Sequence, residues 1–405
     1  MRVLALIAGF VLLAVVLLDA FQSIILPRRP VGRFRITRIF FMSTWNPWKL
    51  LARGIRSHRQ RDQFYSTFGP LSLLLLFFVW GALLTLGFGL VFFGLRMPFR
   101  DPLLASSGHW PRLRSCLYFS GTTLFTLGMG DVAPLSQVAR LLTVIEAGTG
   151  LGFIALVIGY VPVLYTAFSQ REVLVALLDA RAGSPPTAAE LLLRHNFPGG
   201  TKILGALLAE WEHWCAQMLE THISYPILCY YRSQHDNQSW LSALTAVLDT
   251  CALLITMLEG GETRQAQLTF AIGRHTLVDL VHVFNREVEE RRLRENPATR
   301  LDSQQLDRLC EALEHTGFSP CSDFESRDRL AALRNLYEPS AQALADYLRL
   351  ELPAWAPPPA NLRKTDAWTV VEGLRTSEAL ADRLTHHVST RSTAINLETH
   401  DREPE

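Results

Sequence analysis

The sequence predicts an all-α protein with a membrane module and a second, more polar helical part. Residues 71–95 carry no charge over a length that can cross a bilayer, and residues 141–168 are apolar apart from Glu146. In the second half, apolar residues recur at three- and four-residue steps, and strand-type alternation is hard to find. The net charge of +1 and the hydrophobic content of 49% therefore average over two unlike halves.

Residues 1–26 are expected to form an N-terminal transmembrane helix, which Asp19 interrupts. A signal peptide is the alternative for residues 1–20, because a basic residue precedes an apolar run. Its cleavage would leave the following loop outside the cell. We expect Asp19 to pair near the inner interface with Arg28, Arg29 or another linker arginine, and to take no part in conduction.

The next segment, residues 27–69, is expected to be a basic cytoplasmic linker. Between Pro27 and Asp62 it carries ten arginines or lysines against one acid, whereas residues 96–115 carry four arginines and one acid. The positive-inside rule therefore places the linker in the cytoplasm. We expect a multi-pass protein of the cell inner membrane, in contact with membrane lipids, whose C-terminal domain is cytoplasmic.

The most informative stretch lies between the two apolar segments and reads Tyr118-Phe-Ser-Gly-Thr-Thr-Leu-Phe-Thr-Leu-Gly-Met-Gly-Asp-Val-Ala-Pro134. A dehydrated cation in a membrane needs oxygen atoms to replace its water shell, and stacked backbone carbonyls can supply them. Gly128 and Gly130 permit the unusual dihedral angles that such stacking demands, at little steric cost. The stretch therefore predicts a pore.

This arrangement resembles the pore module of tetrameric potassium channels, whose filter consensus reads T-V-G-Y-G. The resemblance covers roughly residues 70–168. It implies an outer helix at 71–95, a pore helix and filter at 114–131, and an inner helix at 138–168. It also implies a homotetramer, because one chain holds one filter, with potassium as the permeant ion.

The resemblance assigns the filter to Thr126, Leu127, Gly128, Met129, Gly130 and Asp131. Met129 stands where an aromatic residue is usual, and Phe125 replaces a threonine that often precedes the filter. Selectivity depends on filter stiffness, and methionine is softer than an aromatic residue. Met129 therefore allows a non-selective cation channel as the alternative function. Tyr118 and Phe119 either supply the missing aromatic cuff or simply fill space. Asp131 either concentrates cations at the outer mouth or turns the chain.

The expected inner helix is rich in glycine. In the resembling channels, a glycine about twenty residues past the filter acts as the gating hinge, which points to Gly150, with Pro162 as a second site of bending. Helix packing through Gly148 and Gly152 is the alternative role for these glycines.

Glu146 is an ionisable group inside an expected span, and such groups usually mark a pathway or a partner. The sequence allows a place near the cavity or behind the filter. A structural pair with Arg140 is the rival interpretation.

Residues 169–352 are expected to form a helical cytoplasmic domain that assembles or gates the pore. Further helical runs fall at 264–294, 303–316 and 326–351. The apolar segment 241–258 is only 18 residues long and contains Asp249, so we expect a buried core helix and not a fourth span. Residues 353–405 are expected to hold a proline-rich linker, a last helix around 366–387 and a disordered tail.

Several function classes lack their motifs. There is no nucleophile elbow and no P-loop, so we expect no enzymatic activity. No G-x-G-x-x-G follows a strand, so a Rossmann regulatory domain is not expected either. Two groups have the spacing of helical carboxylate-histidine sites, namely Glu210 with His213, and His275 with Asp279 and His282. We nevertheless expect no metal, no cofactor and no nucleic-acid partner.

Two function classes remain. The first is a cation channel that conducts potassium. The second is a membrane-anchored sensor or scaffold with a degenerate pore, which Met129 and the large C-terminal part favour. The intact Gly128 and Gly130, with Thr126 and Asp131 in place, favour the channel.

Overall fold

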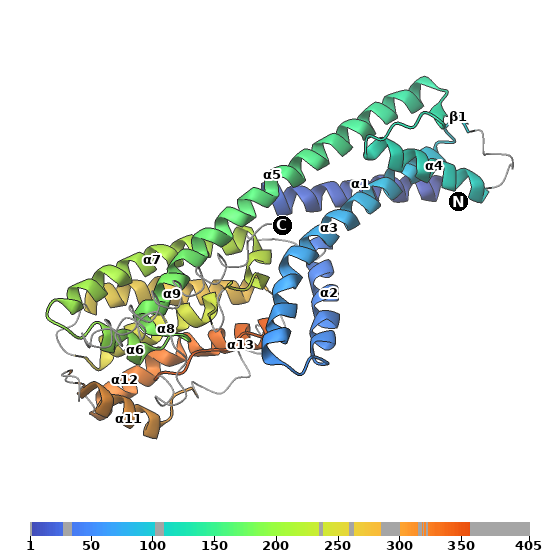
Figure 1. Ribbon diagram of the computed structural model, residues 1–405. Coiled ribbons are helices and arrows are strands. Elements are labelled where there is room, and N and C mark those ends of the chain that lie inside the picture. The colour runs from blue at the N-terminus through green and yellow to red at the C-terminus, as the bar shows by residue number, and fades with distance from the viewer. Residues whose placement is uncertain are drawn as a thin grey trace, which may run out of the picture. The chain divides into compact units, whose positions relative to one another are not determined.

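The computed structural model describes residues 2–26, 35–101, 109–234, 238–258, 263–284, 300–314, 318, 320 and 323–356. Within these residues the chain is mostly helical (Figure 1) and divides into two compact units. The first unit holds the described residues of 1–171, 217–232 and 279–286, and the second holds those of 172–216, 233–278 and 287–405.

Among the described residues, three helical stretches are long and apolar enough to cross a membrane, namely Arg2–Ile25, His58–Gly94 and Gln137–Ala182. The first is α1 (Arg2–Ala20) with a π-helical turn, η1 (Phe21–Ile25); the others are α3 and α5. Both α3 and α5 extend well beyond the apolar segments expected from the sequence. A helix continues for as long as its backbone hydrogen bonds repeat, whereas hydropathy identifies only the apolar part that can lie in the bilayer.

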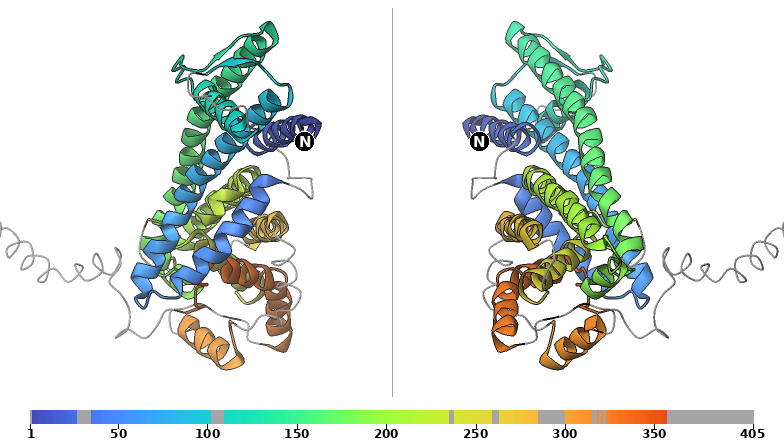
Figure 2. Two further views of the ribbon diagram at one scale, coloured as in Figure 1. Left: turned by 90° about the vertical axis from the view of Figure 1, so that its right-hand side faces the viewer. Right: turned by 90° about the vertical axis from the view of Figure 1, so that its left-hand side faces the viewer.

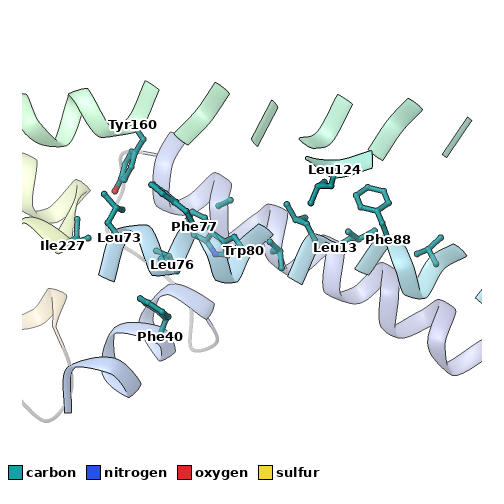
Figure 3. Packing of buried hydrophobic residues seen from close by; sticks show 14 of the residues in the cluster. Leu13, Phe40, Leu73, Leu76, Phe77, Trp80, Phe88, Leu124, Tyr160 and Ile227 are labelled. Carbon is teal, nitrogen blue, oxygen red and sulfur yellow. The ribbon is translucent and has the colours of Figure 1, made fainter. Parts of the chain in front are cut away.

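In the first unit, α1 packs along α3 and α3 contacts α4 (His109–Leu124) (Figure 2). A side-chain carbon on Gly9 of α1 would lie only 2.8 Å from the carbonyl oxygen of Gly87 on α3. Glycine at this position therefore allows the close approach of the two helices. Figure 3 shows the buried side chains that fill the space between these helices, including Leu13 and Phe88.

A buried carboxylate ties α1 to α2 (Ile36–Ala52) and α3. The Oδ2 atom of Asp19 accepts hydrogen bonds from Trp80 Nε1 at 3.0 Å, and from the hydroxyl and backbone N–H of Thr37 at 2.6 and 3.1 Å. Arg35 Nε lies 3.8 Å from the other carboxylate oxygen. The expected pairing of Asp19 with a linker arginine is therefore confirmed. Arg28 and Arg29 lie outside the described residues.

Residues 217–232 join the first unit although they come late in the chain. They hold the end of α7 (Gly200–Ser224) and the 3₁₀-helix η2 (Pro226–Tyr230). The ring of Tyr230 packs against Phe41, Trp45 and Phe68, with ring centroids 5.7, 5.2 and 5.2 Å away. One aromatic core therefore joins α2, the first part of α3 and η2.

The second unit contains α6 (Ala188–Arg194), α8 (Trp240–Thr256), α11 (Ser303–Glu314), α12 (Phe324–Asn335), α13 (Glu338–Leu348) and parts of α5, α7 and α9 (Thr263–Val283). Thr187, Ser239 and Asp323 cap α6, α8 and α12, because each side chain accepts a hydrogen bond from a first-turn N–H. α8 is buried along nearly its whole length, which confirms the expected core helix at 241–258. The helix expected at 366–387 lies outside the described residues.

Asp249 of α8 is satisfied inside the second unit. Its carboxylate accepts from the Tyr337 hydroxyl and from Arg300 Nη2 at 2.6 Å, and Arg300 also reaches Glu338 at 3.1 Å. Burial raises the pKa of Asp249 to about 6, and the Arg300 charge opposes that rise. This network stabilises an acid inside a largely apolar helix.

Candidate functional site

The glycine-rich segment is hydrogen-bonded to the end of α4. The Thr122 carbonyl accepts from the N–H of Leu127 at 2.8 Å and from that of Gly128 at 3.2 Å. Carbonyls in the last turn of a helix lack intrahelical partners, so the chain that follows can use them. The end of α4 therefore sets where the glycine-rich segment begins.

Backbone handedness alternates along this segment. Positive φ angles occur at Thr126 (57°), Gly128 (54°) and Gly130 (77°), and not at Leu127 or Met129 between them. Glycine adopts this region freely, whereas threonine does so at a cost of roughly 1–2 kcal/mol. Such strain persists only where the surroundings impose it, and it concentrates at functional sites.

A two-stranded ribbon closes the loop around α4 and the glycine-rich segment. β1 (Phe99–Arg100) precedes α4, β2 (Ala133–Pro134) follows the segment, and the two pair antiparallel. The N–H of Leu135 adds a hydrogen bond to the Pro98 carbonyl at 3.0 Å. Both ends of the glycine-rich segment are therefore held, one by α4 and the other by the pairing of β1 with β2.

Asp131 links the far end of the segment to α4. One carboxylate oxygen accepts from the N–H of Val132 at 3.0 Å, and the other accepts from the hydroxyl of Tyr118 at 2.8 Å. Asp131 is exposed. Asp131 thus makes the turn-forming contact that the sequence suggested. The attraction of cations by its exposed carboxylate stays a prediction.

The aromatic residues near the segment have different surroundings. The Phe119 ring packs against Phe92 and Phe99, with centroids 5.4 and 4.7 Å away, so it fills space between α3 and β1. The side chain of Met129 is 67% exposed. Of the two candidates for an aromatic cuff, Tyr118 contacts the segment through Asp131 and Phe119 packs elsewhere.

α5 is one uninterrupted helix through both Gly150 and Pro162. A side-chain carbon on Gly150 would overlap the Leu124 carbonyl at the end of α4. Carbons on Gly148 and Gly152 would meet no atom within 4 Å in the described chain. Within this protomer it is therefore Gly150 that packs closely. Its role as a hinge, with bending at Pro162, stays a prediction.

Glu146 faces α4 from α5. It is fully buried, and the Ser120 hydroxyl of α4 donates to its Oε1 atom. Arg140, the partner considered from the sequence, directs its Nε to the Pro134 carbonyl at 3.4 Å. Within the described residues, Glu146 therefore contacts α4 and is not paired with Arg140.

Sequence reasoning missed an arginine network that follows the apolar part of α5. Arg171 donates to the carbonyls of Leu228 at 2.9 Å and Tyr231 at 2.8 Å, and its Nη1 lies 3.3 Å from His222 Nε2. Burial and the Arg171 charge hold the pKa of His222 well below its usual range. The sequence shows only an arginine that follows a long apolar run. No residue near Arg171 in the sequence identifies its partners.

The described residues contain no group of three or more His, Cys, Asp or Glu side chains that could hold a metal ion. Of the pairs weighed from the sequence, Glu210 lies 3.9 Å from Arg181 Nη1. That contact is a salt bridge in the second unit.

Comparison with known proteins agrees with the geometry of the first unit. Residues 83–166 match a family model described as an ion channel, a family of two-helix pore-loop channels. The match runs from the second half of α3 through α4 and the glycine-rich segment into α5. The chain therefore contains a pore-loop ion-channel module and is a membrane protein. A channel module is built for transport, which argues against catalysis.

One curated relative is the uncharacterized membrane protein YdjJ of Bacillus subtilis (strain 168). It is 28% identical over 248 residues, which cover 60% of this chain and 67% of the relative. No solved structure matches the chain.

Proposed function

We propose that the protein conducts potassium across the membrane through a filter made of Thr126, Leu127, Gly128, Met129, Gly130 and Asp131. The observation that carries this proposal is the positive φ at every second residue from Thr126 to Gly130. In an extended strand, successive carbonyls point to opposite sides. Reversing the handedness of alternate residues turns them toward one side, where they can replace the water of a cation.

A filter of this kind has to be assembled from several chains, and we propose a homotetramer. Of the 18 residues that form the most apolar part of α5, only 11% are buried within the protomer. Leu151, Ile158 and Tyr165 are among its exposed large side chains. In a closed ring, part of this surface would contact neighbouring copies and part would line the inner pore or face lipid.

We propose that residues 217–232 couple the cytoplasmic part of the chain to the end of the inner helix. Arg171 is 3% exposed and is held by two carbonyls of that segment. Because buried hydrogen bonds to a charged group are strong, a displacement of the segment would be transmitted to α5. Bending at Gly150 or Pro162 would then change the width of the inner pore.

The orientation is part of the same proposal. The basic residues of the linker lie between the first and second spans, so this side faces the cytoplasm of the inner membrane. The third span then delivers the C-terminal part to the cytoplasm, and the glycine-rich segment enters from outside. The membrane lipids around these helices are expected contacts.

A non-selective cation channel is the second candidate, and one observation favours it. Met129 is 67% exposed among the described residues, whereas an aromatic residue at that position would brace the filter. A filter that is free to widen would admit sodium as well as potassium.

Flux measurements on the reconstituted full chain test the proposal. Liposomes with the protein should release potassium much faster than sodium under equal gradients, and empty liposomes should release neither. Native mass spectrometry of the same preparation should show a tetramer. Equal potassium and sodium flux would favour the second candidate. Absence of both fluxes, or flux from monomers alone, would contradict conduction through a shared filter.

If the Met129 side chain limits selectivity, Met129→Tyr should raise the potassium preference, measured as a reversal potential under a potassium–sodium gradient. Strong potassium selectivity of the wild type, with no gain in the variant, would show that methionine suffices. In that case the second candidate would be withdrawn.

A further inference from the structure

Glu146 occupies an unusual place on α5. The helix exposes most of its surroundings within the protomer: Val144 is 69% exposed and Ile145 is 50% exposed. Glu146 is 0% exposed. The Glu146 side chain thus points toward α4, whereas its neighbours Val144 and Ile145 are exposed. A buried acid needs hydrogen-bond partners inside the protein.

The partner of Glu146 is a hydroxyl with two acceptors around it. Ser120 Oγ contacts Glu146 Oε1 and also lies 2.9 Å from the Thr85 carbonyl of α3. A serine hydroxyl carries one hydrogen, so it can donate to only one of these oxygens at a time. The second carboxyl oxygen, Glu146 Oε2, is buried and has no hydrogen-bond partner among the described residues.

The charges on neighbouring elements do not compensate a carboxylate here. α3 carries no charged residue from 71 to 94. On α4, His109 and Arg114 are exposed and Arg112 donates to the Met97 carbonyl at 3.1 Å. On α5, Arg140 donates to the Pro134 carbonyl. Tyr118 and Asp131 are paired with each other. A carboxylate in this environment would be buried with one shared donor, which is costly.

A protonated Glu146 satisfies both contacts of the Ser120 hydroxyl at once. Its O–H donates to Ser120 Oγ, and the Ser120 hydroxyl then donates to the Thr85 carbonyl. The chain of hydrogen bonds runs from α5 through α4 to α3. Its centre is a fully buried serine of the pore helix.

This chain lies one helical turn from the filter segment. Ser120 precedes Leu124, the last residue of α4, by four positions, and Gly150 follows Glu146 by four positions. Gly150 packs against the Leu124 carbonyl. Two successive turns of α5 therefore fix the end of α4, and the Thr122 carbonyl between those contacts holds the filter segment.

We propose that Glu146 is a positioning residue for the ion path and that it acts as a neutral carboxylic acid, hydrogen-bonded to Ser120, and not as a charge. Resting on the proposed conduction by residues 126–130, this assigns the acid inside the membrane to the support of the pore helix. It follows that the hydrogen bonding of residue 146 matters for conduction and that its charge does not.

Infrared spectra and flux of the full chain in lipid test the proposal. At neutral pH, the difference between wild type and Glu146→Gln should contain the C=O stretch of a protonated carboxyl. Ser120→Ala should shift that band without removing it. Glu146→Gln should keep potassium flux within about twofold of wild type, because an amide can also donate to Ser120. Glu146→Leu should lower flux about tenfold or more, since it leaves Ser120 without that partner.

The outcomes separate this inference from the function it rests on. Absence of the protonated band, with Glu146→Gln losing as much flux as Glu146→Leu, would overturn the neutral-acid role. Unchanged flux and selectivity in Glu146→Leu would overturn the positioning role. A wild-type chain that shows no flux would instead refute conduction, while the infrared band would still report the state of Glu146.

Discussion

The hydroxyl of Tyr118, on the pore helix, donates a 2.8 Å hydrogen bond to the carboxylate of Asp131, just past the last glycine of the proposed filter. Asp131 lies thirteen positions after Tyr118, and the whole glycine-rich segment lies between them. The contact therefore ties the C-terminal end of this segment to the helix that precedes it, while Thr122 holds the N-terminal end.

Removing this contact should loosen the segment with little effect on global stability. We expect Tyr118→Phe to lower the preference for potassium over sodium, because the outer end then moves more freely. The bond lies in an exposed position, so its loss should change the free energy of unfolding little. Tyr165→Phe is the matched control, since Tyr165 is exposed and its hydroxyl has no hydrogen bond in the described chain. Reversal potentials measure the effect, and identical values for all three proteins would contradict it.

Close packing at Gly150 predicts a stability effect. A methyl group there would collide with backbone, the Leu124 carbonyl, which cannot rotate away as a side chain can. We expect Gly150→Ala to destabilise the protein by about 1–3 kcal/mol. Gly148→Ala, on the same helix with open space around it, should change stability by less than about 1 kcal/mol. Thermal unfolding in detergent compares the two. Normal stability of Gly150→Ala with altered flux would instead favour the hinge role.

The buried His222 predicts a pH dependence. Its pKa is lowered in the folded chain, so below about pH 6.5 the unfolded chain binds more protons than the folded chain. Stability should therefore decrease as the pH falls below that value. His222→Gln lacks this linkage, and its stability should fall less steeply, by at most about 1.4 kcal/mol per pH unit. Chemical unfolding at several pH values measures both slopes. A steeper slope for the variant would contradict a neutral, buried His222.

The buried charges of the second unit predict a large mutational effect. Arg300→Met would leave the fully buried Asp249 without its cation, while Glu338 would keep only Arg334, at a cost of about 3–5 kcal/mol. Arg327→Met breaks an equally short pair with Asp307, but that pair is partly exposed and should be worth at most about 1 kcal/mol. Unfolding free energies of the full-length variants compare the two. Similar losses would mean that the Arg300 network is not closed to water.

Much of the membrane part could be predicted from local pattern. A charge-free run such as 71–95 and glycines at alternate positions, Gly128 and Gly130, carry their meaning within a few residues. The extra length of α3 and α5 could not be predicted in this way, because hydropathy ends where polar helix begins. The helix α2 inside the basic linker was also missed. The positive charge of that segment was used to predict its side of the membrane, and its helical pattern was not considered.

The remaining features depend on contacts between distant parts of the chain. Nothing near Arg171 in sequence indicates that Leu228 and Tyr231 hold it. Likewise, a lone Glu146 is compatible with a cavity, a filter support or an ion pair until the position of Ser120 is known. Sequence pattern thus identified which groups were unusual, and the tertiary fold supplied their partners.

Potassium flux through glycine variants of the reconstituted full chain tests the central claim most directly. Gly128→Ala and Gly130→Ala add a methyl group where φ is positive and where no atom lies within 4 Å, so they oppose the backbone conformation without a clash. Gly54→Ala, in the linker at ordinary contact distance, is the control. We predict that both filter variants abolish potassium flux while their thermal unfolding, and the flux of the control, stay close to wild type. Wild-type flux in both filter variants would contradict conduction through this segment.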